Sequence, residues 1–294
     1  MKTELRWIGH VTTSCLHAAE AAAYDRAIVD ARLAAAVAGP AAALQAEIAE
    51  ALLPSARFWR FLIALSTTFA SSRDLAKMAL VRTIGAGERV ALLREPIAGR
   101  VEDVKIAVQN AFPKMAEELE LRTGPLRLQW EARGPGMLRT IGDLTEERLI
   151  VPGADVIVVY PALGGGGDAQ LPNNTVRIEA VLANQMPELP EAVRLAWMLA
   201  QLHLDVPLFS EKIHADRLPH VARFAMLLPA LQAAEEVELV QLTPELVQRA
   251  ITAWNFEVPL DVDAADLVIR WWATYRDSRP PFNIALEALD QMLG

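Results

Sequence analysis

The first third of the chain places apolar residues at the spacing of α-helices. Between residues 17 and 53 the apolar positions recur every three to four residues, and Gly39-Pro40 interrupts them. This pattern predicts a helical hairpin that turns at Gly39-Pro40, because glycine ends helices and proline begins them. Further helices are expected from Phe58 onward, over 75–84 up to the glycines at 85 and 87, and over 101–122 with a break at Pro113.

The pattern changes after Gly124-Pro125 to one that is typical of strands. Residues 126–131 and 175–181 alternate apolar and polar positions, which predicts half-buried strands. Residues 155–160 are rich in β-branched side chains, which predicts a strand buried on both faces. A short helix over 137–141 is expected between the first two strands. Together these segments predict a small sheet.

The last third of the chain is expected to be helical again. Pro190 and Glu191 begin a helix that runs to Leu204 and is apolar on almost every side, so it should lie at the centre of the fold. Later helices are expected after Thr243-Pro244, after an Asp263 cap, and from Pro281.

The order of these elements predicts an α+β fold, predominantly helical, with a small central sheet of about three to four strands. The expected regions are an N-terminal helical hairpin at 1–55, a helical region at 56–123, the sheet with its glycine-rich loop at 124–187, and a C-terminal helical region at 188–294. Residues 56–294 are expected to form one domain.

Four consecutive glycines, Gly164, Gly165, Gly166 and Gly167, follow the buried strand and are a candidate ligand-binding loop. A strand followed by glycines is also how phosphate-binding loops begin. However, no Gly-Lys-Ser/Thr follows, and the next predicted element is a strand, so no helix N-terminus faces an anion. A long, mobile connection between two strands is the favoured interpretation, and a place where the backbone closely approaches another group is the alternative.

Composition excludes several classes of protein. With 28 basic against 37 acidic residues the net charge is −9, which argues against a broad nucleic-acid-binding surface. The single cysteine, Cys15, excludes an internal disulfide and a thiolate metal cluster. The residues before Cys15 lack the apolar core of a signal peptide, and the most apolar later stretch is too short to span a bilayer. A cytoplasmic protein that does not bind membranes is expected, and the alanine-rich composition suggests a bacterial one.

One polar cluster is a candidate metal site. His203, Glu211, His214 and His220 lie within eighteen residues, and Glu211 and His214 share a helix face if the segment is helical. The spacing matches no strong zinc motif, so solvated or capping residues are the alternative. Cys15 and His17 are two residues apart and would point away from each other on a helix, and no Gly-x-Ser-x-Gly occurs. No catalytic residue and no cofactor is therefore assigned.

Residues 125–205 are similar to the scaffold of zincin metallopeptidases in the order strand, helix, strand, loop, strand and buried helix. The resemblance implies that the helix would carry His-Glu-x-x-His. In this chain Trp197, Met198 and Gln201 stand at those three places, and none can replace the ligands or the base. The resemblance thus implies a catalytically inactive protein, whereas the same pattern also describes a general α+β domain.

The leading functional hypothesis is a non-catalytic protein that acts through protein–protein contacts or self-association. Trp271-Trp272 points to a partner or an interdomain contact, since adjacent tryptophans on one helix face different directions, but burial on two sides is the favoured explanation. The alternatives are a metal-dependent hydrolase that uses the 203–220 cluster, a catalytically inactive zincin-like scaffold, and a small-ligand binder at the glycine loop.

Overall fold

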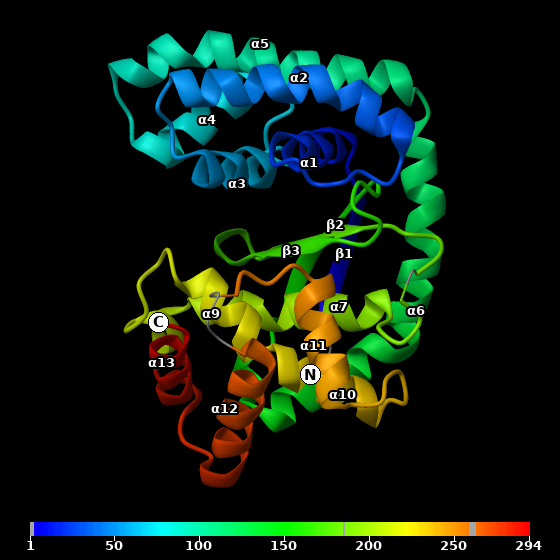
Figure 1. Ribbon diagram of the computed structural model, residues 1–294, viewed down its shortest axis with the longest axis vertical. Helices are drawn as coiled ribbons and strands as arrows, with labels where there is room; N and C mark the ends of the chain where they lie inside the picture. Colours follow the sequence, from blue (N-terminus) through cyan, green and yellow to red (C-terminus); the bar gives the residue numbers. More distant parts are fainter. Residues whose placement is uncertain (1–2, 185, 259–262) are drawn as a thin grey trace.

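A mostly helical chain surrounds one small sheet. The computed structural model describes residues 3–184, 186–258 and 263–294. Its elements form two lobes, one above the other in Figure 1, and the sheet lies close to the boundary between them. The fold class predicted from the sequence, predominantly helical α+β, is confirmed.

The sheet has the strand order β1-β2-β4-β3. Its strands are β1 (Glu4–Gly9), β2 (Gly153–Val159), β3 (Gly167–Gln170) and β4 (Thr175–Glu179). β1, β2 and β4 are parallel, and β3 is an antiparallel edge strand. Every residue of β4 and most of β2 are buried, as expected for parallel strands with both faces covered.

One lobe consists of the helices between β1 and β2 that precede residue 112. They are α1 (Val11–Ala23), α2 (Ala31–Glu50), α3 (Ser55–Leu65), α4 (Ser72–Ile84) and α5 (Glu88–Ala111). Their apolar faces form a hydrophobic core of their own, which includes Cys15, Phe58 and Trp59. We call this part of the molecule the helical lobe.

The long helix α6 (Met115–Leu144) joins the two lobes (Figure 1). Its first turns, with Met115 and Leu119, belong to the core of the helical lobe. Its later part, with Trp130 and Met137, belongs to a second hydrophobic core. Gly134 makes this packing possible, because the Trp130 ring lies within 2.5 Å of the place where a Cβ on residue 134 would be.

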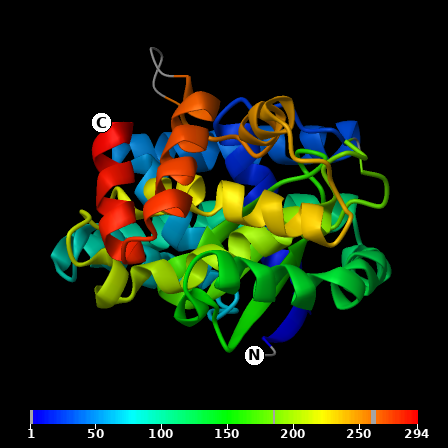
Figure 2. The same cartoon turned by 90° about the horizontal axis from the view of Figure 1, so that it is seen from below.

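The second core is built by α6 and the elements that follow it. They are η1 (Glu147–Leu149), η2 (Leu171–Asn173), α7 (Glu191–Gln201), η3 (Leu202–Asp205), α8 (Pro207–Ser210), α9 (Leu218–Ala225), α10 (Leu227–Glu236), α11 (Pro244–Ala253), α12 (Ala264–Ser278) and α13 (Phe282–Leu293). Figure 2 shows α12 and α13 side by side at the edge of this lobe.

Helix α7 lies at the centre, as predicted. All of its residues from Glu191 to Gln201 are buried. It contacts β3 and β4, whereas α1 contacts β2 from the other side of the sheet (Figure 1). The sheet is therefore held between one helix from each lobe.

Several other predicted elements are confirmed. The buried strand and the strand after the glycine loop are β2 and β4, and α4 ends at Gly85. The helix break at Pro113 is the boundary between α5 and α6. Thr243 and Asp263 cap α11 and α12 through their side-chain oxygens, and α13 follows Pro281.

The predicted strand at 126–131 is wrong, because this segment belongs to the helix α6. Residues 137–141 are helical as predicted, but they are part of the same long helix and do not form a short one of their own. The period-two pattern at 126–131 is coincidental: Leu126 and Trp130 are buried, while Leu128 between them is 68% exposed. The alternating Leu, Arg and Gln residues have the period of a strand. However, Leu126 and Trp130 are four residues apart, and only a helix places both of them against the second core while Leu128 is exposed.

The predicted helix end at Gly39-Pro40 is also wrong, because α2 continues through Pro40. Val37, Ala41 and Leu44 are fully buried at helical spacing on both sides of the proline, and this packing outweighs the one hydrogen bond that the proline removes. The hairpin turn lies instead between α1 and α2. Strand β1, which precedes both helices, had not been predicted. The predicted region boundaries at residues 55, 123 and 187 stay predictions.

Candidate functional site

The densest buried polar cluster lies at the end of β4, where the two lobes meet. The Glu179 carboxylate, which is fully buried, accepts hydrogen bonds from the backbone N–H groups of Ala162 and Leu163 at 3.0 and 2.8 Å and from that of Gly165 at 2.7 Å. Nε2 of His17, on α1, lies 2.6 Å from the same carboxylate. The glycine-rich loop thus cradles an anion, and this anion is the protein's own side chain.

These contacts hold the pKa of Glu179 at about 2. Burial alone would raise the pKa, but the hydrogen bond and charge of His17 and the backbone N–H donors of Leu163 and Gly165 lower it by more. Glu179 therefore stays ionised wherever the protein is folded near neutral pH. A saturated carboxylate of this kind fixes structure and is poorly placed to accept a proton from a substrate.

A second ion pair also joins β4 to α1. Arg177 of β4 lies 3.5 Å from Glu20 of α1, and both side chains are largely buried. Together with His17 and Glu179, it ties the helical lobe to the sheet through buried charges. Such pairs contribute little net stability but cost several kcal/mol when one partner is removed, about 3–5 kcal/mol in other proteins.

The glycine loop is shaped by the close approach of α7. Gly164 and Gly165 have φ values of +78° and +131°, which favour glycine. A Cβ on Gly165 would lie 3.2 Å from a Glu191 oxygen, and one on Gly167 would lie 2.7 Å from the Arg177 carbonyl oxygen. Of the two interpretations from the sequence, close approach describes the loop. Ligand binding at Gly164–Gly167 stays a prediction.

Glu191 and Arg194 lie beneath the loop in the first turn of α7. Their side chains are 7% and 5% exposed, and an Arg194 nitrogen lies 3.4 Å from a Glu191 oxygen. That oxygen and the Nε of Arg194 have no hydrogen-bond partner among the described residues. Burial, together with the charge of Glu179, raises the pKa of Glu191 to about 7, although Arg194 opposes the shift. The Glu191 carboxyl group therefore changes charge near neutral pH.

The substitution Glu191→Gln is expected to stabilise the protein at pH 8 by about 1–3 kcal/mol and to have a much smaller effect on its stability at pH 5. The folded state binds a proton at Glu191 up to about pH 7, whereas the unfolded chain releases it near pH 4.5, so the wild-type protein loses stability between these values. Urea unfolding at both pH values measures the effect. The exposed neighbour Glu188→Gln, which removes only a surface ion pair with Arg249, is the control and should shift stability by less than about 1 kcal/mol at either pH. An equal effect of Glu191→Gln at both pH values would contradict the assignment.

The three positions that a zincin helix would use are occupied by packing residues. Trp197 stacks on Trp254 at 4.7 Å between ring centroids, and its Nε1 donates to the Arg223 carbonyl oxygen. Gln201 donates to the Trp197 carbonyl oxygen, and Met198 packs against Gly167 of β3. All three side chains are buried. They hold α7 in place and present no ligand to a metal or a substrate.

The 203–220 residues do not come together. His203 contacts the Arg148 carbonyl oxygen at 3.0 Å, His214 accepts from the Asp216 N–H, and His220 packs edge-on against Phe224. Glu211 is exposed. Throughout the described ranges, no group of three or more His, Cys, Asp or Glu residues is arranged to hold a metal ion. Glu211 and His214 do not share a helix face, because the short helix α8 ends at Ser210, before both residues.

Cys15 is fully buried in the core of the helical lobe, and burial raises the pKa of its thiol to about 12. We expect its reaction with a disulfide reagent at pH 8 to be at least about 100-fold slower in the native protein than in guanidinium chloride, because the thiolate is the nucleophile. The release of the thiol chromophore with time measures both rates. Native reaction at the unfolded rate would show that Cys15 is accessible.

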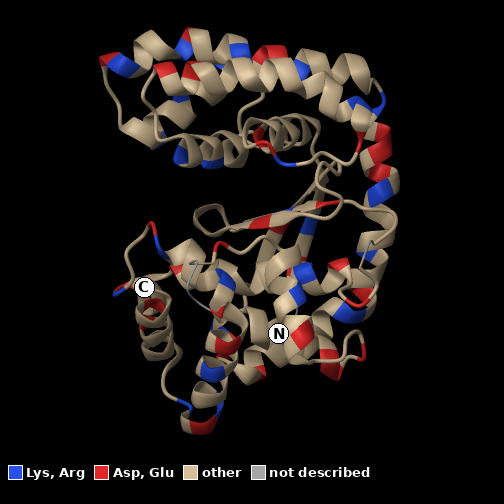
Figure 3. Ribbon diagram, in the orientation of Figure 1, with Lys and Arg blue, Asp and Glu red and all other residues tan. Residues whose placement is uncertain are grey.

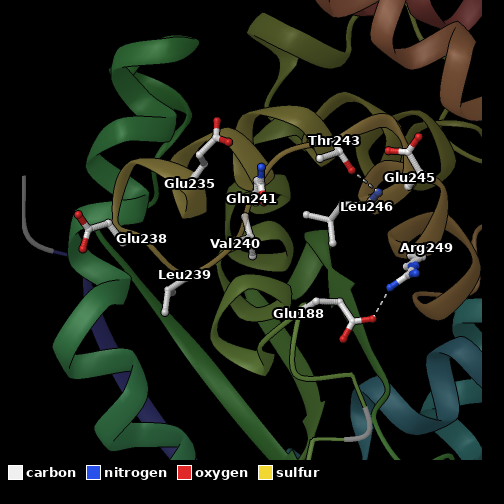
Figure 4. Close-up of a pocket in the computed structure, with 10 residues that line it drawn as sticks. All are labelled: Glu188, Glu235, Glu238, Leu239, Val240, Gln241, Thr243, Glu245, Leu246 and Arg249. Carbon is white, nitrogen blue, oxygen red and sulfur yellow. Dashed lines mark hydrogen bonds and ion pairs between the residues drawn. The ribbon is translucent and has the colours of Figure 1, made fainter.

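A surface pocket of about 700 Å³ lies where α10 leads into α11 (Figure 4). Its lining residues are Glu188, Glu235, Glu238, Leu239, Val240, Gln241, Thr243, Glu245, Leu246 and Arg249. Two of its acidic groups already serve the fold, since Glu188 pairs with Arg249 at 2.7 Å and Glu235 accepts from the Leu242 N–H at 2.8 Å. The pocket had no counterpart in the sequence analysis.

Sequence reasoning did not single out Glu179, Glu191, Arg177 or Arg194. The one available signal was that these charged residues stand inside segments predicted to be buried, where charges are rare unless paired. Trp271 and Trp272, by contrast, are explained by burial on two sides: their indole N–H groups donate to Ala285 and Gln232.

Comparison of the chain with protein-family models, with curated proteins and with solved structures found no match. In the part of the chain that the structure describes, helices long and apolar enough to cross a membrane do not occur.

Proposed function

We propose that this is a non-catalytic protein that acts through contacts with other protein chains, and that the outer face of α6 is a contact surface. The observation that carries the proposal is the exposure of two leucines on that face: Leu121 is 75% and Leu128 is 68% exposed. They lie seven residues apart, which is two helical turns, so they share one face.

Smaller apolar residues extend this face. We define the α6 stripe as the exposed residues Leu121, Pro125, Leu128, Ala132 and Pro135. They follow one another at intervals of three or four residues, on the side of α6 opposite the buried Leu119, Leu126 and Trp130. Single exposed leucines are ordinary on protein surfaces, but a contiguous apolar row is typical of a surface that another chain covers.

The arrangement of the ionisable residues supports a non-catalytic role. Glu179 is saturated by four contacts, and the zincin-like positions of α7 hold Trp197, Met198 and Gln201. Glu191 and Arg194 are paired beneath the glycine loop. Glu179 therefore serves to join the lobes, and the Glu191–Arg194 pair lies within α7. We expect the protein to act in the cytoplasm.

A photo-crosslinking residue introduced at position 128 tests the proposal in cells that express the full chain. The expected result is a discrete protein adduct after irradiation. The same residue at position 92, which is 76% exposed on α5, is the matched control and should give none. Equal crosslinking at both positions, or no adduct at 128, would contradict the contact surface.

A catalytically inactive zincin-like scaffold is a second candidate for the same chain. It is favoured by one observation: α7 directly follows β4 and packs against β4 and the antiparallel edge strand β3. A metal-dependent hydrolase would instead require the 203–220 residues to bind a metal. Purified protein supplemented with zinc or iron is expected to retain none. Stoichiometric metal that is lost in both His214→Ala and His220→Ala would overturn the non-catalytic proposal.

A further inference from the structure

Building on the proposed function, we infer that the partner of the α6 stripe is a second copy of this chain. The two α6 helices pack antiparallel about a two-fold axis at Leu128. The inference rests on how charge is distributed along the exposed face of α6 and on the room around Leu128.

Opposite charges stand at equal distances on either side of Leu128. Glu117 precedes it by eleven residues and Arg139 follows it by eleven, and both are exposed. Eleven residues are close to three helical turns, so these three side chains lie along one face, and each charge is about 16 Å from Leu128. In an antiparallel pair, Glu117 of each copy therefore meets Arg139 of the other.

Both charges are available for such a contact. The ion pairs within α6 join Arg122 to Glu118 and Arg127 to Glu131. Among the described residues, neither Glu117 nor Arg139 forms an ion pair. Figure 3 shows the acidic start of α6 beside the end of α5 and basic residues further along the helix. A parallel pair would place like charges opposite each other, so the charges select the antiparallel orientation.

The surface around Leu128 fits an identical surface. Gly124 and Ala132 lie one turn before and one turn after it, and a Cβ on Gly124 would meet no atom within 4 Å. These small residues leave depressions beside a protruding leucine. The Leu128 of a second copy can fill such a depression, which is the self-complementarity that a two-fold interface requires.

The stripe alone is smaller than the interface of a stable dimer, which buries at least about 1,000 Å². We therefore expect a reversible dimer that forms at micromolar concentration. Sedimentation of the full chain over a concentration series measures its dissociation constant. Leu128→Glu places two carboxylates against each other on the axis and should raise the dissociation constant at least about tenfold. Leu92→Glu, on α5, is the matched control and should leave it unchanged.

A charge exchange tests the orientation. Glu117→Arg or Arg139→Glu alone should each weaken the dimer about fivefold, and the double variant should restore it, because each variant removes or recreates two symmetric ion pairs. Additive weakening in the double variant would overturn the antiparallel arrangement. Circular dichroism confirms that each variant stays folded.

Cysteine crosslinking locates the axis, because the native Cys15 is buried and will not compete with an introduced surface thiol. Leu128→Cys should form a disulfide between two copies under mild oxidation, and Leu92→Cys should not. A chain that stays monomeric at about 100 μM, far above a micromolar dissociation constant, and does not crosslink at position 128 would overturn self-association. In that case, a photo-adduct at 128 with a different protein would preserve the proposed function, and the absence of any adduct would remove both.

Discussion

Glu179→Ala is expected to lower the free energy of unfolding by about 3–5 kcal/mol, because it leaves several buried groups without their partner. The substitution removes the acceptor of the Ala162, Leu163 and Gly165 N–H groups and leaves His17 buried beside a cavity. Urea unfolding followed by circular dichroism measures the loss.

Two comparisons isolate the cause. Glu95 is exposed and pairs with Arg73 and Arg94 on the surface, so Glu95→Ala should cost less than about 1 kcal/mol.

The pH dependence gives a second comparison. Because the folded pKa of Glu179 is about 2, the wild-type protein keeps this stability above about pH 4.5 and loses it as the pH falls toward 2. In Glu179→Gln this acid-dependent loss should be absent. A cost below 1 kcal/mol for Glu179→Ala would show that the cluster is dispensable.

Trp197→Ala is expected to destabilise the protein by about 3–5 kcal/mol, the usual range for removing a fully packed aromatic ring. Trp197 is 1% exposed and stacks on Trp254 and Phe256, and the guanidinium of Arg223 lies 5.5 Å from its ring centroid. Loss of the ring would leave this cation with one aromatic neighbour in place of two. Urea unfolding by circular dichroism is the suitable measurement, because tryptophan fluorescence would itself change.

Trp197→Phe separates packing from hydrogen bonding. It keeps an aromatic ring but loses the indole N–H that donates to Arg223, and it should cost about 1–2 kcal/mol. If Trp197→Ala were no worse than Trp197→Phe, α7 would not depend on this aromatic cluster.

The parts of the fold that were predicted correctly are those whose signal is local. Strand β2 is a run of β-branched residues, and α7 begins after a proline and is apolar on almost every side, so both can be recognised without knowledge of distant partners. The errors in α6 and α2 have a common cause. Glycine and proline at 124–125 and 39–40 are strong local signals for a break, but the buried side chains on both sides of them pack against a core that only the folded chain creates.

The candidate site was beyond prediction for a similar reason. His17 and Glu179 are 162 residues apart, and nothing near either residue indicates the other. The glycine loop stands out in the sequence, but its role depends on Glu179. The hairpin of β3 and β4 separates this residue from the loop along the chain. The α6 stripe was hidden by the incorrect assignment of residues 126–131 as a strand, because a strand would have buried Leu128 together with Leu126.

The parallel pairing of β1 with β2 has a consequence for how the protein is made. Arg6 and Asp155, which pair across these strands, are 149 residues apart, and the entire helical lobe lies between them. The helical lobe is thus a very long crossover between two neighbouring strands. During synthesis its helices can associate while β1 still has no strand beside it. Sheet assembly must wait until β2 and β4 have left the ribosome, so the sheet is expected to close late and slowly, after the helical lobe.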